Sequence, residues 1–407
     1  VEAGRIAHGA TGHNAGQVVD YFEKPFSEIV TEYGLEMAVA GQKAITDSWK
    51  LLEEILEETH IHISFARFMG YAGCTTIEQL LVHLENKWQK VQGGLHVEQA
   101  MLAEEIILKE SIPEKYHAFC KYIPQKQILE YLETPHTKYI AALQSRKGTM
   151  NSALFVEKLS EFLLEKYPER FAIREHAPID EVHLYEDNVT LESKNHTINT
   201  KYVVLCTNGF ENININNHTG LNINPFFHSN ISGIVGYMAG YLEKETLLPK
   251  AISYFPATDK VSGADPYFYV TRRNHMWEEI EKSLVCIGGP EEIHEEIRNY
   301  SASFPYSKIA FQDIDTFLKE TYPDSCRDGV DYVFKWHGLM GYTKSGIRSI
   351  GVEPANSRLL YNLGCNGVGI LPSIYGGSKI AKHLSGELVK QTIFDPIIQK
   401  TVVISAK

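Results

Sequence analysis

The chain has 407 residues, of which 43% are hydrophobic and 22% are charged, so it can bury one large core or two to three smaller ones. Its formal net charge of -12 argues against nucleic acid as a partner, because a phosphate backbone is bound through a broad basic face. The longest apolar stretches, such as residues 359–371, are interrupted by Asn and Gly and are too short to span a membrane.

The cysteines and histidines argue against a metal or redox centre. The six cysteines form no C-x-x-C pair, and the close pair His60 and His62 has no third ligand nearby in the sequence. We therefore predict no metal site, and we expect a reducing, cytoplasmic compartment. The cysteines are Cys74, Cys120, Cys206, Cys286, Cys326 and Cys365.

The first residues lead directly into a loop of small residues at 10–17. In dinucleotide-binding folds the first turn carries G-x-G-x-x-G, and an acidic residue about 20 positions later binds a ribose hydroxyl. No G-x-G-x-x-G occurs in the chain, and Glu2 stands where that acidic residue is expected. We therefore predict that the sequence starts after the first strand and helix of such a fold. The alternative reading of Glu2 is an exposed terminal carboxylate.

Residues 26–133 have apolar positions three and four apart, as in Phe26, Ile29, Val30 and Tyr33, which predicts a mainly helical segment. The same spacing predicts a helix over 153–167, with Asn151 or Ser152 as its N-cap.

After residue 168 the apolar period changes to two, which predicts strands at 171–174, 182–185, 189–191 and 202–205. The last is a wholly apolar run, as expected for a strand buried on both faces. Residues 212–224 are rich in Asn and predict a loop. Residues 231–289 predict an antiparallel sheet, with its clearest strands at 267–273 and 284–288, and a helix follows at 306–321.

The C-terminal part predicts a strand at 359–363, a glycine-rich turn at 364–369 and a helix at 373–384. Glycines in such a turn let the backbone approach a ligand, and the amides at the start of the helix favour negative charge. The alternative is a plain strand-to-helix turn.

Together these segments resemble the FAD-dependent oxidoreductases related to D-amino-acid oxidase, glycine oxidase and sarcosine oxidase. The resemblance rests on five segments in the same order, at residues 10–17, 177–179, 206–209, 336–346 and 366–370. It implies FAD as the cofactor, and it implies that the backbone of Gly367 and Gly369 lies beside the flavin ring. Amides at that position would stabilise charge on the reduced flavin.

The resemblance implies cofactor contacts in each of these segments and at the first residues. The implied residues are Glu2, Ala3, Gly4, Ala10, Thr11, Gly12, Asn14, Ala15, Gly16, Gln17, Ile179, Cys206, Thr207, Asn208, Gly209, Gly341, Gly367, Val368, Gly369 and Ile370.

The chain also departs from the family. Relatives of the glycine oxidase type have an Arg near Met340 that holds the substrate carboxylate, and some relatives have Asp at Ser345 and Pro at Arg348. Some relatives attach the flavin through a Cys or a His. Cys365 and His13 are the nearest candidates here, and we predict non-covalent flavin.

Three residues are the candidates for catalysis. Tyr269 and Arg273 share one face of their strand by the period of two, so they could line a substrate cavity, or the face could simply be solvated. His337 precedes a flavin-side segment and could shape the pocket, although a His between aromatic residues also packs well in a core.

The predicted fold class is α/β (α+β). A Rossmann-like FAD domain, formed by residues 1–25, 139–212 and 340–407, lacks its first strand and glycine turn. An antiparallel β-rich substrate domain covers 213–339, and a helical insertion covers 26–138. The predicted reaction is oxidation of an amine or amino acid by hydride transfer to flavin N5, which gives an imine, with oxygen or an unknown carrier as electron acceptor. The alternatives are a flavin dehydrogenase of a hydroxy acid or polyol, and a non-catalytic fragment that holds FAD too weakly to turn over.

Overall fold

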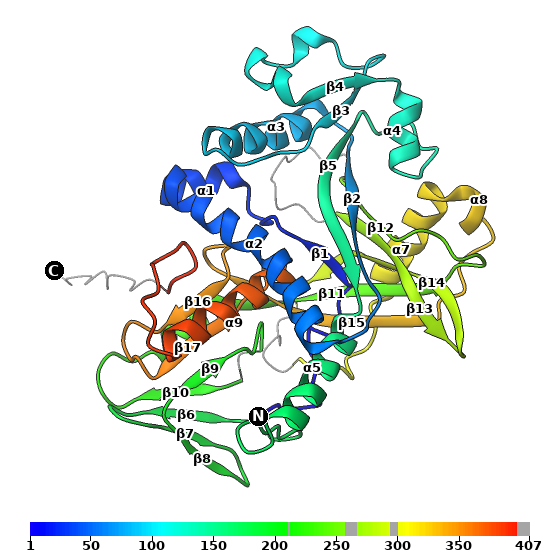
Figure 1. Ribbon diagram of the computed structural model, residues 1–407. Coiled ribbons are helices and arrows are strands. Elements are labelled where there is room, and N and C mark those ends of the chain that lie inside the picture. The colour runs from blue at the N-terminus through cyan, green and yellow to red at the C-terminus, as the bar shows by residue number, and fades with distance from the viewer. Residues whose placement is uncertain (211, 257–266, 294–299, 397–407) are drawn as a thin grey trace, which may run out of the picture.

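A ten-stranded mixed sheet crosses the middle of the molecule (Figure 1). The computed structural model describes residues 1–210, 212–256, 267–293 and 300–396. In spatial order the strands are β15 (Phe334–Thr343), β11 (Ile231–Leu242), β14 (Ile280–Glu292), β13 (Phe268–Trp277), β12 (Lys250–Tyr254), β2 (Phe65–Cys74), β5 (Ala141–Met150), β3 (Ala100–Ala103) and β4 (Cys120–Ile123), with β1 (Gln17–Val19) paired to β5.

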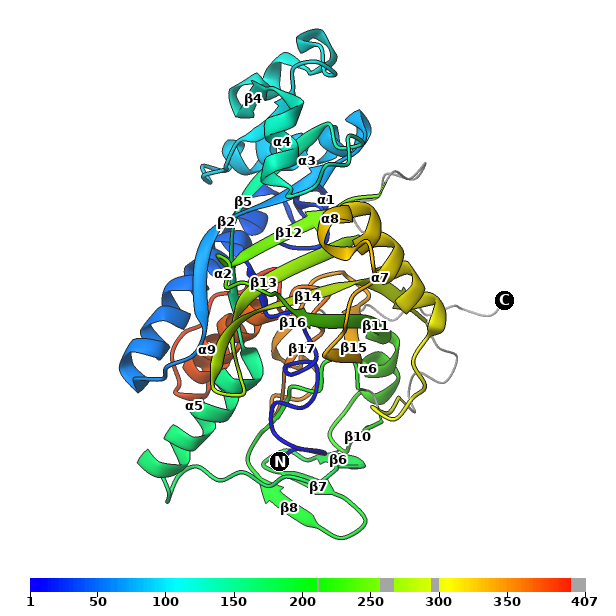
Figure 2. The ribbon, with the colours of Figure 1, turned by 90° about the vertical axis from the view of Figure 1, so that its right-hand side faces the viewer.

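The predicted antiparallel sheet is confirmed, because β11, β13, β14 and β15 pair antiparallel with their neighbours. One face of these strands buries Val270 and Ile287 against Ile314 and Phe317 of α7 (Lys308–Thr321), which α8 (Pro323–Cys326) follows. Figure 2 shows α7 lying along this side of the sheet. The opposite face carries a smaller apolar cluster that includes Ala15, so the N-terminal loop covers the side away from α7.

A three-stranded sheet brings the two predicted ligand loops together. It consists of β16 (Ser349–Val352), β17 (Leu359–Leu363) and β9 (Val203–Leu205), and β17 runs parallel to β9. The carboxyl ends of parallel strands lie at the same edge, which is where ligands of such sheets bind. Residues 206–209 therefore meet the turn at 364–369, and α9 (Ile370–Leu384) begins directly after that turn.

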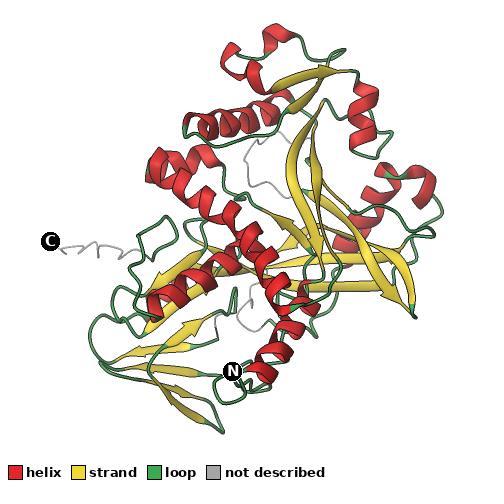
Figure 3. Ribbon diagram, in the orientation of Figure 1, coloured by secondary structure: helices red, strands yellow, loops and turns green. Residues whose placement is uncertain are grey.

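Helix α1 (Phe26–Tyr33) and helix α2 (Leu35–Thr59) confirm the helical pattern after residue 26. Ile45 and Leu52 of α2 share a core with Leu371 of α9, and Figures 1 and 3 show the two helices side by side. The other predicted helix of this region is α3 (Ile77–Gln92), and shorter helical turns follow at η1 (Lys109–Ser111), η2 (Glu114–Phe119) and α4 (Gln125–Tyr131).

The prediction of a mainly helical segment was wrong where β2, β3 and β4 lie, because these strands join the large sheet. Strand β2 contains small residues instead of a clear apolar alternation. At Gly70 a Cβ would come within 2.6 Å of the Lys147 side chain, and at Gly73 within 2.7 Å of Tyr139. The close packing that requires glycine therefore also hides the strand from pattern analysis. The domain boundaries stay a prediction.

Two further expectations were wrong. Residues 212–224, expected as a loop, contain β10 (Asn214–Asn217) and lead into α6 (Asn224–Asn230). Fully buried Ile215 anchors β10 beside β6 (Glu181–Leu184). Residues 171–174 form no strand, although the amide of Glu2 donates to the carbonyl of Arg174 at 2.9 Å. The expected strands at 182–191 are confirmed in the sheet of β10, β6, β7 (Val189–Glu192) and β8 (Thr197–Thr200).

The helix at 153–167 is confirmed as α5 (Ser152–Lys166), and the Asn151 side chain accepts from the amide of Leu154. Elsewhere, an ion cluster ties the turn after α4 to the large sheet: the exposed Glu133 binds buried Lys250 of β12 and, at 3.3 Å, buried Arg272 of β13. Burial opposes ionisation of Glu133, but the two cations outweigh it and lower the pKa of this carboxyl.

Within the described ranges, every helix is too short or too polar to cross a membrane.

Candidate active site

A large cavity lies where the N-terminal loop, the large sheet and the start of α9 meet. It has a volume of about 530 Å³ and is lined by residues from loop 10–17, from β11, β13 and β15, and from the turn before α9. Cavities that bind small molecules and cofactors have this size and this mixture of apolar walls with few polar groups.

Many of the predicted residues line this cavity. The predicted residues that the structure brings together there are Ala10, Thr11, Asn14, Ala15, Gln17, Cys206, Asn208, Tyr269, Gly367, Val368, Gly369 and Ile370. His13, Met340, Arg348 and Cys365, which mark differences from the family, also lie in its wall.

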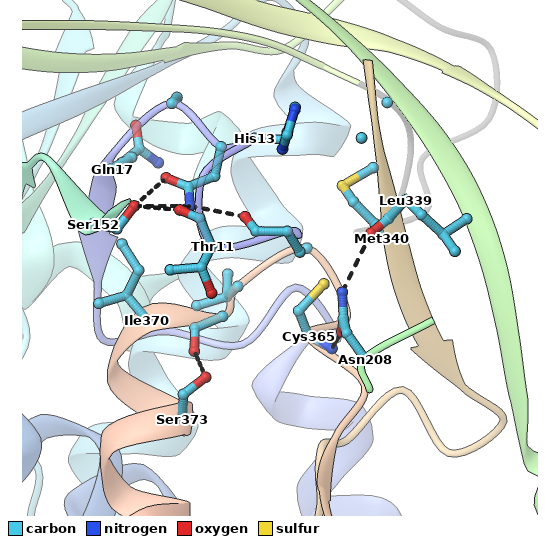
Figure 4. A pocket seen from close by; sticks show the side chains of 18 of the residues that line it. Thr11, His13, Gln17, Ser152, Asn208, Leu339, Met340, Cys365, Ile370 and Ser373 are labelled. Carbon is cyan, nitrogen blue, oxygen red and sulfur yellow. Dashed lines mark hydrogen bonds between the residues drawn. The ribbon is translucent and has the colours of Figure 1, made fainter. Parts of the chain in front are cut away.

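The loop at 10–17 is held in shape by its own polar groups. The Asn14 amide group donates to the carbonyls of Ala10 and Thr11 at 3.0 and 2.7 Å, and its Oδ1 accepts from the amide of Gly16 at 2.7 Å. The Ser152 hydroxyl, at the start of α5, bonds to the Thr11 carbonyl at 2.7 Å (Figure 4). The small residues that predicted a ligand loop therefore form a fixed wall.

The turn at 364–369 is equally fixed. Asn366 has a left-handed backbone (φ 46°), and its Oδ1 accepts from the amide of Thr343 on β15 at 2.8 Å. Gly367 has φ 78°, and a Cβ there would come within 2.7 Å of Cγ of Glu23. A side chain at Gly367 would thus be disfavoured both by its backbone conformation and by its neighbour.

Asn208 joins the two ligand loops. Its Oδ1 accepts from the amide of Cys365 at 2.8 Å, and its Nδ2 donates to the carbonyl of Leu339 at 3.4 Å (Figure 4). Gly209 faces away from the cavity toward Gly341, where a Cβ would lie 2.9 Å from the Gly341 Cα. Gly209 and Gly341 therefore allow two backbones to pack closely, and they do not line the cavity.

A buried cation also lines the cavity. Arg348 is 9% exposed, and its guanidinium donates to Oδ1 and to the carbonyl of Asn362 at 2.7 and 2.9 Å. Among the described residues no carboxylate lies within ion-pair distance of it. A buried charge with only neutral partners is costly, so this position suits an anionic ligand group. Gln17 Oε1 in the same wall is buried and has no hydrogen-bond partner in the described part of the chain.

Glu23 is a residue of the cavity wall that sequence reasoning missed. It lies in the segment between β1 and α1, and the Tyr267 hydroxyl donates to its Oε1 at 2.8 Å. Desolvation by the surrounding protein raises the pKa of Glu23 to about 7, with a further increase from the nearby Glu291. The Tyr267 hydrogen bond and the charge of Lys147 act in the opposite direction. No local motif marks Glu23, because its surroundings come from distant strands.

Two of the three predicted catalytic residues lie outside the cavity. His337 is 3% exposed and both its ring nitrogens have partners, the Tyr300 hydroxyl at 2.8 Å and the Phe304 carbonyl at 3.0 Å. On β15 the side chains alternate, so His337 points away from the face that carries Met340. Arg273 lies behind the N-terminal loop, with its Nε 3.5 Å from a Cβ built on Gly16. The structure therefore places these two side chains outside this cavity, and of the three candidates only Tyr269 lines it.

The first residues and residue 179 also lie away from the cavity. The Glu2 carboxylate accepts from the amide of Gly4 at 2.9 Å, and the Glu2 carbonyl accepts from the amide of Ala177 at 2.9 Å. The predicted contacts outside this cavity are Glu2, Ala3, Gly4, Gly12, Gly16, Ile179, Thr207, Gly209 and Gly341. The role of Glu2 toward a ribose stays a prediction.

Away from the cavity, on β6 and β7, the structure gathers three groups that the sequence keeps apart. Ligand atoms of Glu181, His183 and Glu192 lie within 4.8 Å of one another. His183 Nε2 is 3.1 Å from Glu181 and 3.7 Å from Glu192, and this cluster does not contact the cavity.

Comparison with known proteins gives the family of this chain. The family model described as FAD dependent oxidoreductase (DAO) matches residues 1–383, and the chain belongs to this family. The cofactor of the family is FAD. Comparison with the curated proteins returned no match.

Solved structures share the fold. Glycine oxidase from Geobacillus kaustophilus is 15% identical with a TM-score of 0.64, over 97% of this chain and 88% of that one. Glycine oxidase from Bacillus cereus ATCC 14579 is 14% identical with a TM-score of 0.65, over 97% and 91%. L-α-glycerophosphate oxidase from Mycoplasma pneumoniae with FAD bound is 10% identical with a TM-score of 0.64, over 97% and 91%.

Proposed function

We propose that this FAD-dependent oxidoreductase oxidises an amine or an amino acid to the corresponding imine, with FAD accepting the hydride from the carbon beside the nitrogen. The observation that carries this proposal is the half-buried carboxyl of Glu23 in the wall of the cavity, next to the turn of Gly367. The amine and amino-acid oxidases among the proteins of the same fold support the same substrate class.

The cofactor would be held by groups that the cavity already provides. The turn at Gly367 and Gly369 allows close backbone approach, and the first amides of α9 favour negative charge. The Arg348 guanidinium, which lacks a carboxylate partner among the described residues, suits the diphosphate. Gln17 Oε1 is positioned to accept a hydrogen bond. The wall is completed by Ala10, Thr11, Asn14, Ala15, Cys206 and Asn208. We propose that the attachment is non-covalent.

Glu23 prepares the substrate. At neutral pH an amine substrate is mostly an ammonium ion, and the carbon beside an ammonium group is a poor hydride donor. The Glu23 carboxylate accepts one proton from the ammonium group, which leaves a neutral amine with a free electron pair on nitrogen. Its pKa of about 7 places the carboxyl near the operating pH, where a base transfers protons most effectively. Tyr267 keeps the carboxyl in place through its hydrogen bond.

The other side chains of the cavity position the substrate. Tyr269 and Met340 lie in the wall, and Tyr269 is the predicted catalytic residue that we retain. Oxidation then removes the carbon-bound hydrogen as a hydride, and water hydrolyses the imine. Positioning of the reacting carbon is the main contribution of such a cavity. The electron acceptor is oxygen or a carrier.

A substrate panel tests this proposal. The full chain is reconstituted with FAD, freed of excess flavin, and assayed for peroxide release and for reduction of an artificial electron acceptor with amines, amino acids, hydroxy acids and polyols. We expect turnover with members of the amine or amino-acid group. Turnover restricted to hydroxy acids or polyols, or a protein that remains colourless after reconstitution, would contradict the proposal.

A further inference from the structure

A second, smaller cavity adjoins the cavity of about 530 Å³ described above, which we call the flavin cavity. It has a volume of about 160 Å³ and lies between α3 and strands β2 and β5 of the large sheet. Glu23 and Tyr267 line both cavities, so these two side chains form the partition between them. Lys87, Lys90 and Lys147 all line the second space, which we call the lysine cavity.

The three ammonium groups have only neutral partners. Lys147 is 1% exposed and donates to the Tyr71 carbonyl at 3.2 Å and to the Ser253 hydroxyl at 3.0 Å. Lys87 donates to the Glu98 carbonyl at 2.7 Å, and Lys90 lies over the ring of Phe26 at 5.4 Å.

In the described part of the chain, no carboxylate lies within ion-pair distance of these lysines. Glu98, which attracts Lys87 at longer range, pairs with Arg146 at 3.4 Å and with His96 at 3.3 Å. Asp20 acts on Lys90 only through longer-range attraction.

Enclosed cations without a counter-charge are unusual, because buried charges in proteins are normally paired. Burial lowers the pKa of Lys147 to about 7 and that of Lys87 to about 8, and it also lowers the pKa of Lys90. Glu23 offsets only part of this for Lys147. An anion in the lysine cavity would restore the charged form of the lysines and remove their mutual repulsion.

We propose that the lysine cavity binds the carboxylate of an amino-acid substrate whose amino group lies in the flavin cavity beside Glu23. This assignment rests on the proposed amine oxidation. Glu23, which accepts the proton, stands in the partition that the two cavities share, so the amino group and the carboxylate of one zwitterion would each meet a group of opposite charge.

The lysine cavity has the size and polarity for one carboxylate and a short chain. Its volume of about 160 Å³ is well above the roughly 10–15 Å³ that a cavity needs to hold one water molecule. Asn86 adds a neutral donor, since its Oδ1 accepts from the amide of Ser27 at 3.0 Å and its NH2 group has no partner among the described residues. A carboxylate accepts several hydrogen bonds at once, which suits lysine and amide donors together.

Binding of pentanoate to the FAD-loaded full chain tests the assignment without turnover. Calorimetric titration is carried out on the unaltered protein and on Lys90→Met, which keeps the apolar stem over Phe26 and removes the charge. We expect Lys90→Met and Lys87→Met each to weaken pentanoate binding about tenfold or more. Lys50→Met is the matched control, because Lys50 is an exposed lysine of α2 outside both cavities.

Equal pentanoate affinity in the unaltered protein and both cavity variants, or no binding at all, would overturn the assignment. Binding of inorganic phosphate as tight as that of pentanoate would likewise overturn it, in favour of a general anion site. If a methionine variant loses its native thermal transition, Lys90→Gln and Lys87→Gln replace it in the same titration.

A second series separates this inference from the proposed function. Rates are compared for 4-aminobutanoate to 6-aminohexanoate and for butylamine to hexylamine. If an amino acid has a higher kcat/KM than the amines, and this difference disappears in Lys90→Met, the result supports carboxylate binding in the lysine cavity. Oxidation of both series with equal kcat/KM leaves amine oxidation in place and rejects the lysine cavity. Pentanoate binding that depends on Lys90, without oxidation of any amine, keeps the lysine cavity as a carboxylate site and rejects the proposed reaction.

Discussion

Glu23→Gln is the substitution that most sharply tests the proton transfer. The amide has the shape of the carboxyl, and its oxygen can still accept from the Tyr267 hydroxyl, so the partition between the two cavities is preserved. What is lost is the ability to accept a proton. A positioned general base contributes about 10²-fold to 10⁴-fold, so we expect kcat/KM at pH 7 to fall by about 10²-fold or more.

The direction in which kcat/KM changes with pH follows from the ionised form of Glu23 that is active. The carboxylate is the active form, and the pKa of Glu23 is about 7, so kcat/KM of the unaltered protein should rise as the pH increases through that value. In Glu23→Gln this rise should disappear, and activity should instead follow the ionisation of the amine substrate itself. The assay is kcat/KM from pH 5.5 to 9 with one amine substrate.

Substitution of Tyr267 and of Glu291, two neighbours of Glu23, should shift the pH at which kcat/KM rises in opposite directions. Tyr267→Phe removes a hydrogen bond that favours the carboxylate, so the pKa of Glu23 should increase and the rise should shift to higher pH by about one unit. Glu291→Gln removes a negative charge that disfavours the carboxylate, so the rise should shift to lower pH. An unchanged rise near pH 7 in Glu23→Gln would refute the reasoning, whatever the loss of rate.

Three further predictions concern the cofactor and the stability of the fold. Gly367→Ala should weaken FAD binding about tenfold, because its left-handed backbone costs about 1–2 kcal/mol with a side chain and the new Cβ meets Glu23; flavin fluorescence titration measures this, and Gly377→Ala, at a site with open space, should bind FAD normally. Arg348→Met should also raise the Kd for FAD in the same titration, and an unchanged Kd would contradict the role of its guanidinium. Glu133→Gln should lower the free energy of unfolding in urea by about 1 kcal/mol at pH 7, because the Glu133 side chain is 40% exposed and solvent screens its ion pairs. Because the pKa of Glu133 is lowered in the folded protein, this difference should persist above the unfolded pKa and vanish as the pH falls through the folded one; a difference that persists at lower pH would contradict the ion cluster.

The sequence was sufficient where local chemistry determines the backbone. Small residues at 10–17 and at 364–369 predict close backbone approach, and both segments line the cavity. The apolar strand ending at Cys206 predicts a ligand loop, and the structure pairs β9 in parallel with β17, which places that loop against Cys365. These features depend on the backbone φ, on side-chain size and on the spacing of apolar residues. All three can be inferred from residues that are close together in the sequence.

The sequence was insufficient where side chains from distant segments meet. Burial by distant segments raises the pKa of Glu23, and Tyr267 and Lys147, which partly oppose this rise, also lie far from it in the chain. Period two placed Arg273 correctly on the face of Tyr269, but the N-terminal loop covers that end of the strand. The place of His337 also depends on distant residues, since its hydrogen-bond partners are Tyr300 and Phe304.

Anaerobic mixing of the FAD-loaded protein with substrate tests the central claim most directly. A single turnover is followed through the flavin absorbance near neutral pH, with amines, amino acids and hydroxy acids offered separately. Loss of the absorbance with an amine or amino acid, at a rate that Glu23→Gln reduces by about 10²-fold or more, is the expected result. Loss of the absorbance with hydroxy acids alone, or an equal rate in Glu23→Gln, would contradict the account.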